Sequence, residues 1–219
     1  MKKLSNMKIS GKIYLLVLIA MLGLVSITGV GQYEISKVFD SANFTTVNVM
    51  PSFNTIYKIK NSFRQIQISS RDYLLSKDTN ERANLDQTIA DEDANITKLL
   101  DYYERELLSD NEDKELLDQD RDALKRWLVV IEERMALARQ GKEAEAYASV
   151  TTSRTIQAAV EQAFEDHIKY NEKLAVTSSA HAAAIKTEAI WIAISATALL
   201  LVVISVVGWV IANLALARP

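Results

Sequence analysis

The sequence predicts an all-α protein, an antiparallel up-down-up-down four-helix bundle flanked by two transmembrane helices. Three observations predict this fold. All 28 Asp and Glu lie between Glu34 and Glu188, so both ends of the chain are free of acidic residues. Glycine and proline, which end helices and form turns, are nearly absent from the middle, where only Pro51 and Gly141 occur. Apolar residues of the middle recur at heptad-like spacing, which is typical of helices that bury one face against each other.

The first predicted transmembrane helix covers residues 13–31, a stretch of 19 residues without a charge. At 1.5 Å per residue it reaches about 28 Å, close to the thickness of the hydrocarbon core. Four lysines precede it, and the positive-inside rule therefore places residues 1–12 in the cytoplasm. A cleaved signal peptide is the alternative interpretation, but the residues that follow the apolar stretch make a poor cleavage site.

The second predicted transmembrane helix covers residues 189–214, which also carry no charge. Trp191 and Trp209 lie near its two ends, and tryptophan prefers the level of the lipid headgroups. Two spans would place residues 32–188 outside the membrane and return the chain to the cytoplasm at residues 215–219. The outer domain holds 20 Lys and Arg against 28 Asp and Glu, a formal charge of −8. This negative charge argues against nucleic acid as a partner.

The middle of the chain is expected to form four helices with short connections. Each carries an apolar stripe, and they cover about residues 34–76, 79–108, 111–140 and 143–188. Helix-capping residues separate the first three helices, and Gly141 suits the position just after the third. Pro51 should kink the first helix or mark a restart. The fourth helix is expected to continue unbroken into the second span.

The residues give no sign of enzymatic chemistry. Cysteine is absent, and so are a phosphate-binding loop, a nucleophile elbow and a zinc-protease motif. His167 and His181 are about 21 Å apart along one helix, too far to share a metal. We interpret His167 as a side chain that flanks the core, and Asp118, Asp120 and Asp122 as a solvated acidic face. No enzyme activity, cofactor or metal is therefore expected.

The candidate ligand site combines arginines with hydroxyl groups. Arg64 and Arg71 lie seven residues apart, so they project from one face of the first helix. They are as far along the chain from the first span as residues 151–155 are from the second, where hydroxyls replace the apolar stripe. Guanidinium groups bind carboxylates through paired hydrogen bonds, so this level suits an anionic ligand. The candidate ligand-binding residues are Arg64, Arg71, Arg126, Thr151, Thr152, Ser153, Arg154 and Thr155.

The alternative interpretation is that these arginines are ordinary flanking charges. In that case they would pair with acidic neighbours across the helix interfaces and bind no ligand. The spacing alone leaves both interpretations open for Arg64 and Arg71. For Arg126 and Arg154 it favours the ordinary ion pairs.

Several segments resemble methyl-accepting chemotaxis transducers with a four-helix-bundle sensory domain, the type of the aspartate and serine receptors. Residues 45–52 are similar to the segment that opens this domain in many of them. Residues 63–75 look like the arginine-bearing stretch of the first helix that binds ligand in the aspartate receptor. Residues 146–174 resemble that receptor's fourth helix, where a threonine helps to bind the ligand, and Thr152 or Ser153 falls nearest to it. The last three residues, Ala-Arg-Pro, look like the start of the HAMP relay.

The resemblance implies a homodimeric, two-pass chemoreceptor of the bacterial inner membrane, with the bundle in the periplasm. Such a receptor binds a small anionic ligand and controls chemotaxis signalling through a cytoplasmic adaptor and kinase. The aspartate receptor uses three arginines, whereas this chain has glutamines at 65 and 67. The expected ligand is therefore an organic acid, such as a di- or tricarboxylate, an amino acid or an aromatic acid. Two alternatives remain: the same module on a histidine kinase or diguanylate cyclase, and a bundle that serves only as a dimer strut or docking surface.

Overall fold

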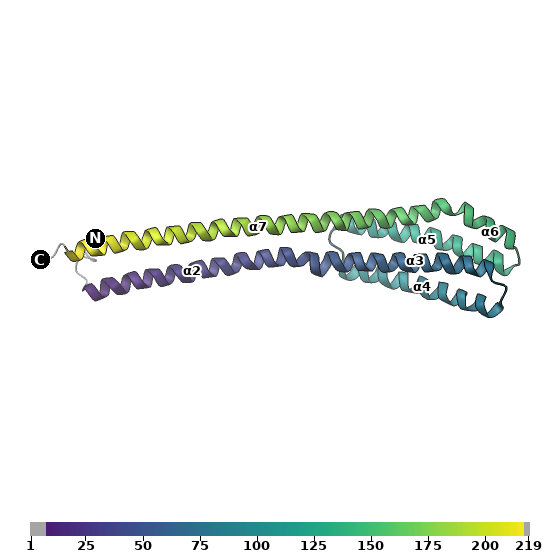
Figure 1. The fold of residues 1–219 in the computed structure, drawn as a ribbon, viewed down its shortest axis with the longest axis horizontal. Helices are drawn as coiled ribbons and strands as arrows, with labels where there is room; N and C mark the ends of the chain where they lie inside the picture. The colour runs from purple at the N-terminus through teal and green to yellow at the C-terminus, as the bar shows by residue number, and fades with distance from the viewer. Residues whose placement is uncertain (1–7, 217–219) are drawn as a thin grey trace. The chain divides into compact units, whose positions relative to one another are not determined.

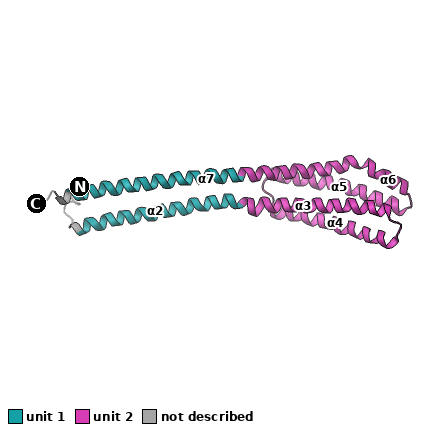
Figure 2. Ribbon diagram, viewed as in Figure 1, with its two compact units in different colours: residues 1–43, 178–219 teal, residues 44–177 magenta. Residues whose placement is uncertain are grey.

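The computed structural model describes residues 8–216, and every regular element in that range is helical (Figure 1). The elements are α2 (Ile9–Phe44), the π-helix η1 (Thr45–Val49), α3 (Met50–Leu75), α4 (Thr79–Glu106), α5 (Asn111–Arg139), α6 (Glu143–Thr152) and α7 (Arg154–Leu216). The predicted all-α fold is confirmed. The chain divides into two compact units, residues 44–177 and residues 1–43 with 178–219 (Figure 2). Residues 1–7 of the expected cytoplasmic N-terminus and 217–219 of the expected HAMP start lie outside the described residues.

The unit of residues 44–177 is the predicted bundle. In it α3, α4, α5 with α6, and the first part of α7 surround one hydrophobic core. At its centre the Phe63 ring of α3 lies 4.4 Å from the Trp127 ring of α5, centroid to centroid, and 6.0 Å from the Phe164 ring of α7. Aromatic pairs of this kind contribute about 0.5–1.5 kcal/mol beyond the burial of their area. These three rings therefore join three helices in one layer.

The ends of the helices follow the predicted capping chemistry. The Asp78 carboxylate accepts hydrogen bonds from the backbone N–H groups of Asn80 and Glu81, which caps α4. Asp110 caps α5 by accepting from the Asp113 N–H at 3.0 Å. After α5 the backbone of Gly141 has a φ of +75°, in the left-handed region that glycine adopts without a Cβ penalty. The boundaries between the first three helices are therefore set locally.

The first helix changes character before Pro51 rather than at it. A π-helical turn, η1, separates α2 from α3, and Pro51 is the second residue of α3. Because proline has no N–H, it interrupts the helical hydrogen bonds directly after η1. The Asn48 side-chain amide in η1 donates to the Leu107 carbonyl oxygen at 2.8 Å, and the Ser109 hydroxyl donates to the Asn48 Oδ1 at 2.8 Å. A π turn contains one extra residue, and these two hydrogen bonds attach the turn to the connection between α4 and α5.

The fourth helix continues unbroken into the second predicted span, as expected, but its predicted first part is divided. A break at Ser153 separates α6 from α7. The preceding residues are two threonines, which favour helices only weakly, and serine and threonine hydroxyls compete for backbone carbonyls. Here the Thr152 hydroxyl bonds to the Ser149 carbonyl oxygen at 3.3 Å and the Ser153 hydroxyl to the Val150 carbonyl oxygen at 3.3 Å. Beyond the break, α7 continues without interruption to Leu216.

The second unit contains the main part of α2 and the C-terminal part of α7. Each of these helices includes an 18-residue window of high mean hydropathy, 2.5 and 2.7 respectively, with none of the window buried in protein. Both are long and apolar enough to cross a membrane, and they contain the predicted spans 13–31 and 189–214. At Gly23 a Cβ would lie 3.0 Å from the Leu200 Cγ. Glycine at this position therefore allows α2 to approach α7 closely.

Candidate functional site

The candidate ligand site surrounds Arg134 of α5, whose side chain is buried (4% exposed). Its Nε donates to the Ser149 hydroxyl at 2.9 Å, its Nη2 to the Ser153 hydroxyl at 2.7 Å, and its Nη1 to the Ser70 hydroxyl at 3.4 Å. Nη2 also donates to the Ser149 carbonyl oxygen at 3.3 Å. The three serines belong to α3, α6 and the break after α6, so one guanidinium joins three segments of the bundle.

The three serines offer only neutral oxygen atoms to this guanidinium. Each hydroxyl gives its own proton to a backbone carbonyl in its own helix, at 3.0 Å for Ser70, 2.7 Å for Ser149 and 3.3 Å for Ser153. Their lone pairs are thereby turned toward Arg134. The cluster is well hydrogen-bonded, yet it contains no negative charge.

The positive charge of Arg134 has no counter-ion among the described residues, because none of their carboxylates lies within 4.0 Å of it. Burial and then the nearby charge of Arg71 lower the pKa of Arg134 below its ordinary value. A buried charge without an ionic partner is costly. An anion bound between Arg134 and the exposed Arg71 would supply the missing charge, and this arrangement can bind a carboxylate.

Two of the predicted site residues belong to this cluster. Ser153 is buried against Arg134, and Arg71 follows Ser70 on α3 and acts on the Arg134 charge. The remaining predicted residues of this segment are exposed around the same break, and they are Thr151, Thr152, Arg154 and Thr155. Their side chains are open to solvent and to a second molecule.

The other two predicted arginines lie elsewhere. Arg64 is exposed and lines a groove of about 450 Å³ between α3 and α7, which also contains Lys60, Glu161 and Glu165. Because this groove carries both signs of charge, it is less suited to an anion than the Arg134 cluster. The Arg126 guanidinium pairs with the Asp122 carboxylate at 2.5 Å on the exposed face of α5. This is an ordinary ion pair, although it lies within one helix and not across a helix interface.

Arg134 was missed as a site residue, although the sequence contained a signal for it. Asp113, Asp120, Trp127 and Arg134 follow one another at intervals of seven, and all four are buried. Residues seven apart lie on nearly the same side of a helix, so the indole of Trp127 marks the buried position for the whole series. The apolar residues Leu117, Leu124 and Ile131 form a neighbouring row, and that row alone was interpreted as the buried side of the helix.

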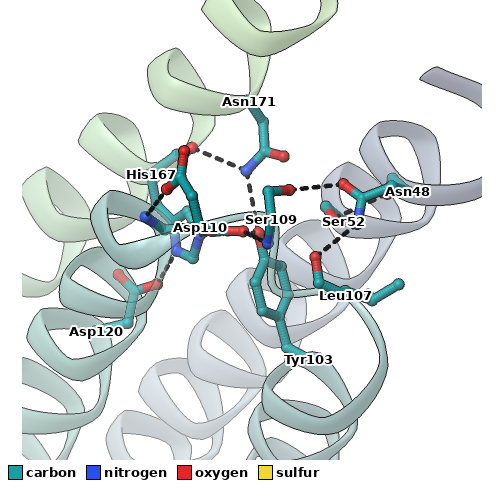
Figure 3. A network of polar contacts seen from close by, with 10 residues as sticks. Asn48, Ser52, Tyr103, Leu107, Ser109, Asp110, Asp120, His167 and Asn171 are labelled. Carbon is teal, nitrogen blue, oxygen red and sulfur yellow. Dashed lines mark hydrogen bonds and ion pairs between the residues drawn. The ribbon is translucent and has the colours of Figure 1, made fainter. Parts of the chain in front are cut away.

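A second buried polar cluster lies in the bundle around His167 of α7 (Figure 3). The imidazole Nδ1 lies 2.6 Å from the Asp120 Oδ2, and Nε2 lies 2.8 Å from the Asp113 Oδ1 and 2.9 Å from the Tyr103 hydroxyl. The His167, Asp113 and Asp120 side chains are 0%, 0% and 1% exposed. These residues and their neighbours are called the His167 network below.

Further hydrogen bonds complete the His167 network. The Tyr103 hydroxyl donates to the Asp113 Oδ1 at 2.9 Å and accepts from the Asn171 amide at 3.1 Å. The second Asp113 oxygen accepts from the Ser109 backbone N–H at 2.8 Å. Ser109 is also bonded to Asn48 of η1, and Figure 3 shows these residues converging from several helices. The network therefore joins α4, α5, α7 and the π-helical turn.

The charges and hydrogen bonds of the His167 network favour a proton on the His167 imidazole. Burial by itself would lower the pKa of His167, but the hydrogen bonds and charges of Asp113 and Asp120 outweigh it and raise the pKa to about 9. Burial raises the pKa of Asp120, against the opposing hydrogen bond from His167. Burial also raises the pKa of the Tyr103 hydroxyl. These interactions therefore favour the imidazolium form of His167.

The solvated acidic face predicted for Asp118, Asp120 and Asp122 is wrong for its middle member. Asp118 and Asp122 are exposed, whereas Asp120 is buried with His167. Alternate residues on a helix point in different directions, so a run of acids in the sequence does not form one face. His167 is likewise part of the core rather than beside it. No group of three or more His, Asp or Glu among the described residues is arranged to hold a metal ion.

Together, these features define a class of protein, a helical bundle with two buried polar clusters on a chain that also has two long apolar helices. The chain belongs to the family of four-helix-bundle sensory modules for signal transduction, because the model of that family matches residues 6–185. This family is a sensory module rather than an enzyme family. Neither the comparison with curated proteins nor that with solved structures returned a match. Family membership and the two apolar helices together indicate a two-pass membrane protein.

Proposed function

We propose that this chain is the sensory and transmembrane part of a bacterial chemoreceptor that binds a small organic acid. The ligand carboxylate would lie between Arg71 and Arg134, with Ser153 and the exposed hydroxyls of residues 151–155 around it. The observation that carries this proposal is the buried Arg134 guanidinium, which has hydroxyl partners but no counter-ion within residues 8–216. Charge-assisted, bidentate binding of a carboxylate would satisfy it.

The proposed topology follows the charge distribution of the sequence. Residues 1–12 and 215–219 lie in the cytoplasm, and the bundle of residues 32–188 lies in the periplasm, because the four N-terminal lysines stay inside. Two copies of the chain form the receptor. Thr151, Thr152, Arg154 and Thr155 are exposed, and they are available to the second copy or to a ligand shared with it.

The proposed mechanism exchanges hydrogen-bond partners of Arg134. Without ligand, the guanidinium holds Ser149 of α6 and Ser153 at the start of α7. A bound carboxylate competes for the same N–H groups, which releases α6 and the first turn of α7. Because α7 is one continuous helix from Arg154 to Leu216, a shift of about 1–2 Å at its start can travel along its length. The ligand biases this equilibrium only by binding the two arrangements with different affinities.

Calorimetric titration of the full chain in lipid nanodiscs with a panel of di- and tricarboxylates, amino acids and aromatic acids tests the site. Removing one charge-assisted partner costs about 1.5–3 kcal/mol, so Arg71→Ala should weaken binding of the active compound by roughly 10- to 150-fold. Arg134→Ala should weaken it at least as much. Arg126→Ala is the matched control, because Arg126 is already paired on the exposed face of the same helix.

Wild-type affinity in both Arg71→Ala and Arg134→Ala would contradict the site. Arg71 is exposed, so its variant should fold normally, and its melting midpoint provides the check. No binding of any compound would favour the dimer strut or docking bundle. The module could also act on a histidine kinase or a diguanylate cyclase. The residues that follow position 219 in the complete gene decide between these outputs, since a chemoreceptor continues into long helices rich in glutamate and alanine.

A further inference from the structure

The His167 network lies apart from the proposed ligand site, because it involves neither Arg71 nor Arg134. The layer of Phe63, Trp127 and Phe164 occupies the α5 register between Asp120 and Arg134. The proposed binding of an organic acid makes no use of His167, although its ring is fully buried between two carboxylates. Its geometry therefore calls for a separate explanation.

The distances define how many protons the network must hold. Both imidazole nitrogens face carboxylate oxygens, at 2.6 Å and 2.8 Å. A neutral imidazole has one nitrogen without a proton, and its lone pair would then point at a carboxylate oxygen at hydrogen-bond distance. Only the imidazolium can donate to both Asp113 and Asp120, so these two short distances favour the protonated ring.

The network also contains a place for a second proton. The Asp120 Oδ1 atom is buried and has no hydrogen-bond partner, while Oδ2 of the same carboxylate accepts from His167. Two carboxylates and one imidazolium leave one uncompensated negative charge inside the bundle. A proton on Oδ1 would remove it without disturbing the contact to the ring.

We infer that the His167 network is a second sensory site of this bundle, and that its ligand is the proton. Loss of the proton from His167 places a lone pair against a carboxylate, so α7 and α5 must separate or shift at this level. Because α7 continues unbroken from Arg154 to Leu216, the change is transmitted along the helix in the same way as a ligand-induced shift. The network makes the bundle responsive to alkaline conditions.

The groups that face His167 come from each of the helices packed around it. The titratable groups that face the ring are Asp113 and Asp120 of α5 and Tyr103 of α4. On α7 itself the neighbours are the neutral Asn171 and the buried Tyr170, whose hydroxyl pKa is raised by burial and by the carboxylates of Asp110 and Asp113. Near η1 the neutral Asn48 and Ser52 lie around Tyr103. The nearest further charges are at the rim and exposed, and they are Asp110, Glu112 and Lys173.

The pH dependence has a definite sign. The pKa of His167 is raised from 6.5 to about 9 in the folded protein. Its contribution to stability is therefore fully present below pH 6.5 and is lost as the pH rises through about 9. Burial also raises the pKa of Asp120, so its proton is likewise held more tightly in the folded state than in the unfolded state. The loss of stability at alkaline pH is that of His167.

Histidine NMR on the full chain in nanodiscs gives the first test. The chain has only two histidines, and the exposed His181 serves as an internal control in the same sample. His167 should remain an imidazolium well above its ordinary pKa of 6.5 and titrate near pH 9. Asp120→Asn removes one of its two carboxylates and should lower this midpoint. A His167 midpoint at or below that of His181, or one that Asp120→Asn leaves unchanged, would overturn the inference.

Distance measurement between spin labels gives the second test, of coupling to the helices. The chain has no cysteine, so Glu115→Cys on α5 and Lys169→Cys on α7, both exposed, carry the only labels. As the pH rises, the distance between the two labels should change with the same midpoint as the His167 titration. This change should occur in the wild-type background and with His181→Gln, but not with His167→Gln. A distance that is constant from pH 7 to 10, or that changes equally with His167→Gln, contradicts proton sensing. If His167→Gln does not fold, the Asp120→Asn background must shift the midpoint instead.

Discussion

At the scale of single residues, two buried cations of the bundle differ in the charge of the groups around them. His167 has a carboxylate on each side, whereas the hydrogen-bond partners of Arg134 among the described residues are serine oxygens. In the first arrangement the imidazolium is shared by two carboxylates, so removing it would leave both buried without their cation. The second leaves a charge uncompensated, and proteins keep such groups mainly where a ligand or a change of state uses them.

Arg134→Met should separate stability from binding. Methionine has a similar length and carries no charge, and replacing a poorly compensated buried ion with an apolar side chain is often neutral or stabilising by about 1–4 kcal/mol. The serines keep their bonds to backbone carbonyls. We therefore expect a melting midpoint at or above that of the wild type, with no further increase when the organic acid is added.

The comparison for this variant is Arg126→Met on the exposed face. Its melting midpoint should stay within about 0.5 kcal/mol of the wild type, as is usual for surface substitutions, and its response to ligand should be retained. A large loss of stability in Arg134→Met alone would mean that the guanidinium is a structural clamp.

His167→Ala should have the opposite effect on stability. It leaves two carboxylates buried without their shared cation, and breaking a buried ion pair in this way costs roughly 3–5 kcal/mol. The measurement is the unfolding free energy at pH 7, followed by circular dichroism. His181→Ala, on the exposed surface of the same helix, should change it by less than about 0.5 kcal/mol. Equal effects of the two substitutions would contradict the ionic description of the network.

Sequence reasoning located part of this residue-scale picture. It correctly brought Arg71 and Ser153 to one level of the bundle, because equal distances from the two spans imply equal heights on antiparallel helices. It did not find Asp113, Asp120 or Arg134, because charged residues are taken to be exposed unless a partner is visible. Their partners lie on other helices, and the pairing of α5 with α7 is not written in any local pattern.

At the scale of elements, the helix ends were predictable because their causes are local. The expected boundaries near residues 76, 108 and 140 agree with α3, α4 and α5 to within about two residues. Asp78, Asp110 and Gly141 fix these ends through their own backbone contacts. The π-helical turn and the break at Ser153 were not predicted, because they depend on contacts with distant residues, Leu107 and Arg134 respectively.

Gly141→Ala tests whether the end of α5 is set locally. The glycine has a positive φ, and two bonds close the turn, from its N–H to the Ala138 carbonyl oxygen at 3.1 Å and from the Lys142 N–H to the Leu137 carbonyl oxygen at 3.0 Å. An alanine in the left-handed conformation costs roughly 1–2 kcal/mol. The unfolding free energy should fall by that amount, whereas Gln140→Ala next to it, at a φ of −79°, should have little effect. A neutral Gly141→Ala would mean that the turn adopts another conformation.

At the scale of the whole molecule, the sequence already separates two solvents. Acidic residues are confined to positions 34–188, and the apolar windows of α2 and α7 have no protein covering them. The family match supports a sensory module. A continuous α7 gives such a module a direct mechanical connection from the start of the helix at Arg154 to Leu216. Two separate inputs, an organic acid at Arg134 and a proton at His167, would then act on the same helix.

The most direct test of the central claim, a two-pass sensor with its bundle outside, is the labelling of single introduced cysteines in intact cells and inverted vesicles. The absence of native cysteine makes every signal specific. Lys8→Cys, at an exposed position, and Arg218→Cys should react with a membrane-impermeant maleimide only in inverted vesicles, and Asn111→Cys at the start of α5 only in intact cells. Reaction of positions 8 and 218 from opposite sides, or of position 111 from the cytoplasmic side, would contradict the account.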